Sequence, residues 1–93
     1  MGVVPKFYHP AYLVDMGLEK SIVVLFLISD KTRAVYFFDS LVQLNGYFAS
    51  LFEPITNPKL MSKKDFLVEI EKLKKEDERL ASMDFTPIKR KLI

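Results

Sequence analysis

The longest run of apolar residues in the sequence extends from Ile22 to Ile28, with polar residues at both ends. A helix that crosses a membrane needs about 20 apolar residues, so this run is too short for a membrane span. It contains the β-branched residues Val23, Val24 and Ile28, which favour a strand over a short buried helix. Because both alternating faces are apolar, we expect a central strand that is covered on both sides.

A shorter strand is predicted on each side of this central run. A polar break at residues 30–33 is typical of a hairpin connection, and the segment Arg33–Phe38 is apolar and aromatic enough to form the next strand. Before the central run, Ala11–Met16 is a weaker strand candidate, and residues 17–20 would turn it into the central strand. These segments predict a three-stranded antiparallel meander. The strand over residues 33–38 would present Ala34, Tyr36 and Phe38 on one face and Arg33, Val35 and Phe37 on the other.

The pattern that follows is helical. Ser40 and Gln43 have the spacing of a capping box, in which each side chain accepts a hydrogen bond from a backbone N–H group at the helix start. Pro54 ends the helix, and residues 53–58 are expected to form a stiff loop. One face of this helix is apolar and is expected to lie on the sheet. Its members are Leu41, Leu44, Tyr47, Phe48, Leu51 and Phe52.

A second helix is predicted from Lys63 to about Met83. Ser62 and Asp65 form a weaker capping signal at its start. Asp77 falls on the apolar stripe and interrupts it, so the second half of the helix has a less continuous apolar face. The apolar members of the stripe are Phe66, Ile70, Leu73 and Leu80.

The two ends of the chain show weaker patterns. Residues 84–93 contain Pro87 and no clear periodicity, so we expect an extended or mobile tail, and residues 1–10 are expected to form an N-terminal arm. Taken together, the pattern predicts a single α+β domain over residues 1–93. Its elements are a three-stranded antiparallel β-meander, two α-helices after it, and a basic C-terminal tail.

Composition supports a packed core and indicates the cellular compartment to expect. Nearly half of the 93 residues are hydrophobic and 13% are aromatic, far more than a disordered chain carries. The chain has no cysteine, which excludes disulfides, thiolate metal sites and cysteine nucleophiles. Its first residues do not resemble a secretory signal. We therefore expect an intracellular, cytoplasmic protein.

The sequence contains no recognisable catalytic or cofactor motif. His9 is the single histidine, and no acid or nucleophile stands near it in the sequence. One histidine without cysteine is a poor basis for a metal site. The three glycines are isolated, so no phosphate-binding loop is present. We expect neither an enzyme nor a bound cofactor.

The apolar surface of the predicted sheet favours association with another chain. Either the two helices cover both sheet faces, or one face is left for a partner, and the interruption at Asp77 favours the second arrangement. We expect a homodimer or another protein complex, since symmetric dimers are the commonest soluble assemblies. Small chains of this style are often phage, viral or plasmid accessory proteins. The candidate partner-binding residues are Tyr36, Phe38, Tyr47, Phe48 and Phe52.

Nucleic-acid binding is the alternative interpretation. The net charge is +2, and the basic excess lies in the C-terminal tail. Basic side chains at a hairpin tip and in a tail can contact phosphates, and exposed aromatic rings on a sheet can stack on bases. The candidate residues are Lys31, Arg33, Lys89, Arg90 and Lys91.

Overall fold

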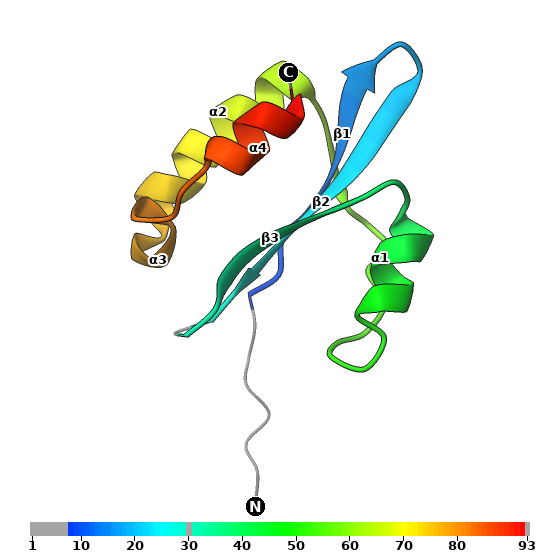
Figure 1. The fold of residues 1–93 in the computed structure, drawn as a ribbon, viewed down its shortest axis with the longest axis horizontal. Coiled ribbons are helices and arrows are strands. Elements are labelled where there is room, and N and C mark those ends of the chain that lie inside the picture. Colours follow the sequence, from blue (N-terminus) through cyan, green and yellow to red (C-terminus); the bar gives the residue numbers. More distant parts are fainter. Residues whose placement is uncertain (1–7, 30, 93) are drawn as a thin grey trace, which may run out of the picture.

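The computed structural model describes residues 8–29 and 31–92, and it contains the predicted meander (Figure 1). The strands are β1 (Ala11–Gly17), β2 (Lys20–Ile28) and β3 (Arg33–Phe38). β2 pairs with β1 on one side and with β3 on the other, in both cases antiparallel. The expected central strand is therefore flanked as the sequence predicts.

A further strand, β4 (Lys59–Ser62), makes the sheet mixed, so the prediction of a purely antiparallel three-stranded sheet is wrong. β4 pairs in parallel with β1, where Leu60 lies beside Leu13. The strand order among the described residues is β3-β2-β1-β4. This strand gives a weak local signal because its apolar residues are limited to Leu60 and Met61. Its partner strand is also far back along the chain.

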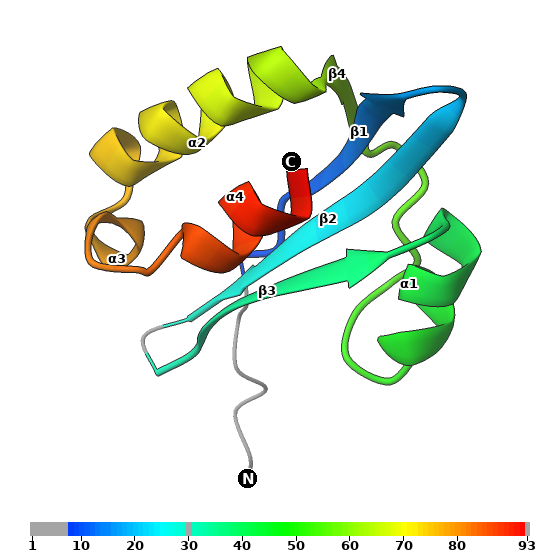
Figure 2. The same cartoon turned by 45° about the horizontal axis from the view of Figure 1, so that its top comes forward.

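The helices lie on both faces of the sheet (Figure 2). Their bounds are α1 (Leu41–Tyr47), α2 (Lys63–Glu76), α3 (Glu78–Ala81) and α4 (Thr86–Leu92). α1 lies on one face, whereas the other helices lie on the opposite face. In the part of the chain that the structure describes, no helix combines the length and the apolar character that a membrane crossing requires.

β2 is buried on both faces, as predicted, and the covering elements belong to this chain. Residues 23–28 are each at most 5% exposed. Its even-numbered side chains pack in a core with residues of α2, α3 and α4, among them Phe66, Ile70, Leu80 and Ile88. Its odd-numbered side chains pack on the other face with Leu44 and Phe48. The helices thus enclose the sheet from two sides, and β2 leaves no whole face for a partner.

α1 is shorter than predicted and ends at Tyr47 instead of continuing toward Pro54. The side chain of Asn45 donates a hydrogen bond to the carbonyl of Ile55 (2.9 Å) and accepts one from its N–H (2.8 Å). In a continuous helix, residues 45 and 55 would be about 15 Å apart along the axis. The contact therefore requires the chain to reverse, and residues 48–51 form turns.

The second predicted helix is interrupted at Asp77, so the expectation of one helix from Lys63 to about Met83 is wrong. Asp77 has an extended backbone (φ −126°, ψ 112°), and its carboxylate accepts a hydrogen bond from the N–H of Arg79 (2.9 Å) at the start of α3. It also pairs with the Arg79 guanidinium at 2.9 Å, and these hydrogen bonds hold the pKa of Asp77 below its usual range. The break redirects the chain so that Leu80 becomes buried.

The C-terminal tail is helical, so the prediction of an extended or mobile tail over residues 84–93 is wrong for residues 86–92. Phe85, Ile88 and Leu92 follow each other at helical spacing, and each is at most 4% exposed. Pro87 lies in the first turn, where a proline is tolerated because its missing N–H has no helical partner there. Ile93 lies outside the described residues.

The predicted N-terminal arm, residues 1–10, is described from Tyr8 onward. The N–H of Tyr8 donates to the carbonyl of Ile28 (2.8 Å), and the N–H of Ile28 donates to the carbonyl of Tyr8 (2.9 Å). The N–H of Phe26 donates to the carbonyl of Pro10 at 3.1 Å. The described part of the arm thus extends the pairing of β1 with β2.

Candidate interaction surface

The start of α1 is fixed next to the end of β3. Ser40 Oγ accepts a hydrogen bond from the N–H of Gln43 (3.2 Å), as the capping pattern predicts. Gln43 Oε1 accepts a hydrogen bond from the N–H of Asp39 (3.0 Å), one residue before the cap. These two bonds fix the angle between strand and helix, so residues near the end of α1 come to lie over β3.

The five candidate partner-binding residues form one connected cluster of rings. Tyr36 packs edge-on against Phe48, with ring centroids 5.0 Å apart. Tyr47 contacts both strand residues, with centroid distances of 5.9 Å to Tyr36 and 5.8 Å to Phe38. Phe52 stacks on Phe48 at 5.3 Å. We call these five residues the aromatic surface.

The members of the aromatic surface differ in how far they reach solvent. Phe48 is 2% exposed and belongs to the core beneath the others. Tyr47 is 66% exposed, and Tyr36, Phe38 and Phe52 are partly buried. Tyr47 is therefore the ring that presents most area to a partner, while Phe48 holds it from below.

Two further apolar side chains near α1 are exposed. Val42 is 81% exposed and Leu51 is 49% exposed. Leu51 is part of the apolar stripe that the sequence shows, but the early end of α1 leaves it in a turn outside the core. Val42 lies off that stripe, so the helical spacing alone indicates an exposed valine at this position.

The basic residues of the nucleic-acid alternative lie at the hairpin tip, at the start of β3 and on α4. Arg33 is exposed at the start of the strand, and Lys31 is exposed in the turn before it. The remaining three, Lys89–Lys91, are exposed on α4. Lys91 Nζ lies 5.9 Å from the centroid of the Phe37 ring. β3 therefore separates an aromatic side, next to α1, from a basic side, next to α4.

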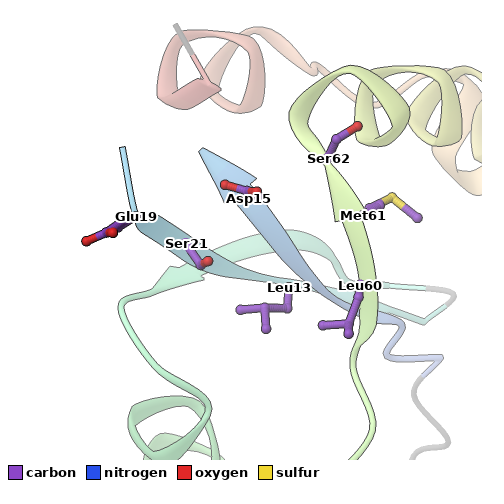
Figure 3. Close-up of a pocket in the computed structure, with 7 residues that line it drawn as sticks. All are labelled: Leu13, Asp15, Glu19, Ser21, Leu60, Met61 and Ser62. Atoms are coloured by element: carbon purple, nitrogen blue, oxygen red, sulfur yellow. The ribbon is translucent and has the colours of Figure 1, made fainter. Parts of the chain in front are cut away.

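A shallow open pocket of about 510 Å³ lies beside β4 (Figure 3). Its apolar lining includes Leu13 and Leu60, which lie side by side on neighbouring strands. Leu60 is 73% exposed. Asp15 and Glu19 contribute acidic groups to the rim. The sequence analysis missed this pocket because it missed β4.

A polar group with perturbed pKa values lies on the opposite sheet face. Lys59 Nζ is 2.9 Å from the carboxylate of Glu69, and this hydrogen bond holds the pKa of Glu69 below its usual range. Tyr12 is 2% exposed, and burial, together with the nearby Glu69 charge, raises its pKa. A phenol with a raised pKa is a poor nucleophile at neutral pH. The group therefore serves to satisfy polar atoms at the edge of the core.

The remaining candidate, His9, stacks on Phe52 with ring centroids 4.3 Å apart and an interplanar angle of 13°. Among the residues that the structure describes, no group of three or more His, Cys, Asp or Glu side chains could hold a metal ion. The aromatic surface is the place where all five sequence-predicted partner-binding residues come together. Comparison with protein-family models, with curated proteins and with solved structures found no match for this chain.

Proposed function

We propose that this chain is a small, non-enzymatic, intracellular interaction module that binds a protein partner through the aromatic surface. The observation that carries the proposal is the position of Tyr47, which is 66% exposed while its ring contacts Tyr36 and Phe38. A rigid, exposed tyrosine supported by other rings loses little side-chain freedom on binding. Such tyrosines are enriched among the residues that dominate interface energies.

The homodimer stays a prediction, but the structure changes the observation on which it rests. The need to cover β2 no longer supports it, because α1 and the helices on the opposite face cover that strand. Exposed apolar side chains remain available to a second copy, among them Tyr47 and Leu60. Light scattering at two concentrations identifies the partner class. A molar mass that rises to twice the monomer value at the higher concentration would identify a second copy as the partner. A monomer mass at both concentrations would leave a different protein as the partner.

The nucleic-acid alternative has weaker support. Its five basic residues come from the hairpin tip, the start of β3 and α4, and two of them lie near carboxylates. Arg33 contributes to the lowered pKa of Asp77, and Arg90 contributes to the lowered pKa of Asp84. These acids offset part of the basic charge, and a phosphate backbone is bound through several basic contacts at once. An affinity for single-stranded oligonucleotides that falls steeply with salt would favour this alternative over the proposal.

A selection from a library of displayed random peptides tests the proposal. The immobilised proteins are the unsubstituted chain, the variant Tyr47→Ser and the control Val68→Ser. Val68 is 65% exposed on α2, so the control removes an equally exposed apolar side chain from the opposite layer. We expect the enriched peptides to bind Tyr47→Ser at least about tenfold more weakly, as for a central interface residue.

The control variant should bind these peptides as the unsubstituted chain does. Equal melting temperatures of the three proteins would show that the substitutions leave the fold intact. Peptides that bind all three proteins equally, together with a constant monomer mass in light scattering, would contradict the proposal. In that case the rings of the aromatic surface would only pack against the core and would bind no partner.

A further inference from the structure

β3 is the end strand of the sheet, and one set of its backbone groups points away from β2. The N–H groups of Phe26 and Ile28 bond toward the β1 side, so the odd-numbered residues of β2 bond toward β3. In the observed register, Leu25 lies opposite Tyr36. The backbone N–H and C=O groups of the even-numbered residues of β3 are therefore hydrogen-bonded to β2. The outward N–H and C=O groups belong to Arg33, Val35 and Phe37.

These outward groups form a template for another strand. β3 has six residues, a common length for a strand, whereas the other end strand, β4, has four. Among the described residues, no backbone hydrogen bond joins the outward N–H or C=O groups of Arg33, Val35 or Phe37 to another segment. An extended peptide that pairs with such an edge gains main-chain hydrogen bonds, and its alternating side chains supply specificity.

The surroundings of the β3 edge differ between its two sides. On the α1 side, an incoming strand would meet Tyr47, which lies against Tyr36 and Phe38. On the α4 side it would meet Arg33 and Lys91, whose ammonium group lies over Phe37. Side chains of a strand alternate between its faces. The edge therefore suits a strand that carries apolar and acidic residues in alternation.

The same charges disfavour a second copy of this chain. An antiparallel pairing of two β3 strands centred on Val35 would place Arg33 of each copy opposite Phe37 of the other. Arg33 would then approach the Lys91 ammonium group beside that ring. Like charges on neighbouring strands are destabilising, and basic side chains are a common protection of sheet edges against self-pairing. The charges thus favour an acidic segment from another protein.

We infer that β3 accepts an extended acidic segment of a partner protein as an added strand. Apolar residues of the segment face Tyr47, and acidic residues alternate with them and face Arg33 and Lys91. This inference rests on the proposed function and specifies its partner. The partner is recognised by its extended conformation, by its backbone and by its alternating pattern.

A synthetic peptide of about eight residues with alternating glutamate and leucine tests the inference, since it is slightly longer than a typical strand. A second peptide has lysine in place of glutamate. We expect the glutamate peptide to bind and to slow amide hydrogen exchange at Val35 and Phe37. The lysine peptide should bind at least about tenfold more weakly because it opposes Arg33 and Lys91.

The variant Val35→Pro removes an outward N–H group and leaves the pairing with β2 in place, because proline is tolerated on the open side of an edge strand. Its matched control, Val35→Thr, loses similar core packing and retains the N–H group. We expect Val35→Pro to weaken glutamate-peptide binding at least about tenfold relative to Val35→Thr. The variant Lys91→Glu tests the charge preference without changing the backbone of β3. It should weaken binding of the glutamate peptide.

Several outcomes would overturn the inference. Absence of glutamate-peptide binding, or equal binding of both peptides, would exclude the acidic segment. Equal binding by Val35→Pro and Val35→Thr would exclude strand addition, and the proposed function would still stand if Tyr47→Ser abolished binding. Concentration-dependent dimerisation that Val35→Pro removes would make a second copy the occupant of the edge. If Tyr47→Ser also leaves binding unchanged, the proposed function fails as well.

Discussion

Asn45 connects the end of α1 to the loop after it through two hydrogen bonds to the backbone of Ile55. We predict that Asn45→Ala lowers the free energy of unfolding by about 1–3 kcal/mol, because it leaves a partly buried N–H and C=O without their partners. Urea denaturation measures the change. Asn57→Ala, in the exposed part of the same loop, should stay within about 0.5 kcal/mol of the unsubstituted chain. Equal effects of the two variants would contradict the role of Asn45.

Glu69 should make stability depend on pH. Its pKa is lowered in the folded state, chiefly by the hydrogen bond from Lys59, so the carboxylate stabilises the fold above the ordinary glutamate pKa of about 4.3. This contribution is lost as the pH falls through the lower folded pKa. We predict that Glu69→Gln lowers the free energy of unfolding by about 1 kcal/mol near neutral pH, a value limited by the 62% exposure of Lys59.

The difference between Glu69→Gln and the unsubstituted chain should shrink as the pH falls below about 4.3. Urea denaturation at a series of pH values measures it. Glu76→Gln is the control, because Glu76 and its partner Lys72 are 3.9 Å apart and both mostly exposed. A difference for Glu69→Gln that is constant with pH would show that the ion pair does not stabilise the fold.

The residue scale also shows where sequence reasoning stops. Helical spacing correctly places Tyr47 and Phe48 on one stripe, yet the first is 66% exposed and the second 2%. Phe48 packs in the core with residues of β2, whereas Tyr47 lies against the rings of the end strand β3. The position of that strand is a tertiary fact, so the sequence predicts the members of the aromatic cluster without predicting which ring reaches solvent.

At the scale of elements, the β1–β2 hairpin contains a strained turn. Leu18 (φ 54°) and Glu19 (φ 59°) both have left-handed backbones, which Asn and Gly adopt at lower cost. We predict that the double variant Leu18→Asn, Glu19→Gly raises the free energy of unfolding by about 1 kcal/mol. Thermal and urea denaturation measure the gain. Leu18→Ala, which retains the strained angle, should give no gain, and a similar gain from it would contradict this explanation.

α4 should be an integral part of the core. We predict that Ile88→Ala lowers the free energy of unfolding by about 2–4 kcal/mol, because Ile88 is fully buried against the sheet. Lys89→Ala, at the exposed neighbouring position, should change it by less than about 0.5 kcal/mol. Urea denaturation compares the two variants. If Ile88→Ala were no more destabilising than Lys89→Ala, the tail would not be packed as the structure shows.

The elements that were predicted well have strong local signals. The limits of β3 agree with the sequence, and the capping residues at Ser40 and Ser62 start α1 and α2 as expected. β4 depends on pairing with a strand about 50 residues earlier in the chain, which no local pattern encodes. α4 has a readable spacing of Phe85, Ile88 and Leu92, but Pro87 favoured an extended interpretation. β4 depends on a partner distant in the sequence, whereas the break at Asp77 depends on its short-range hydrogen bonds to Arg79.

At the scale of the whole molecule, the helices leave the sheet edges more open than its faces. β2 is covered by α1 on one side and by α2, α3 and α4 on the other (Figure 2). The apolar run of residues 22–28 therefore builds the core and does not itself bind a partner. The surface with the strongest case for binding lies along β3, between the aromatic side and the basic side.

The location of the binding surface is tested most directly by amide chemical-shift mapping. Isotope-labelled protein is titrated with the peptide that the displayed-library selection enriches most. The account predicts that the largest shift changes lie in β3 and α1, with Tyr47 among them. Shift changes concentrated on the outer face of α2, or at Leu13 and Leu60 beside β4, would contradict it.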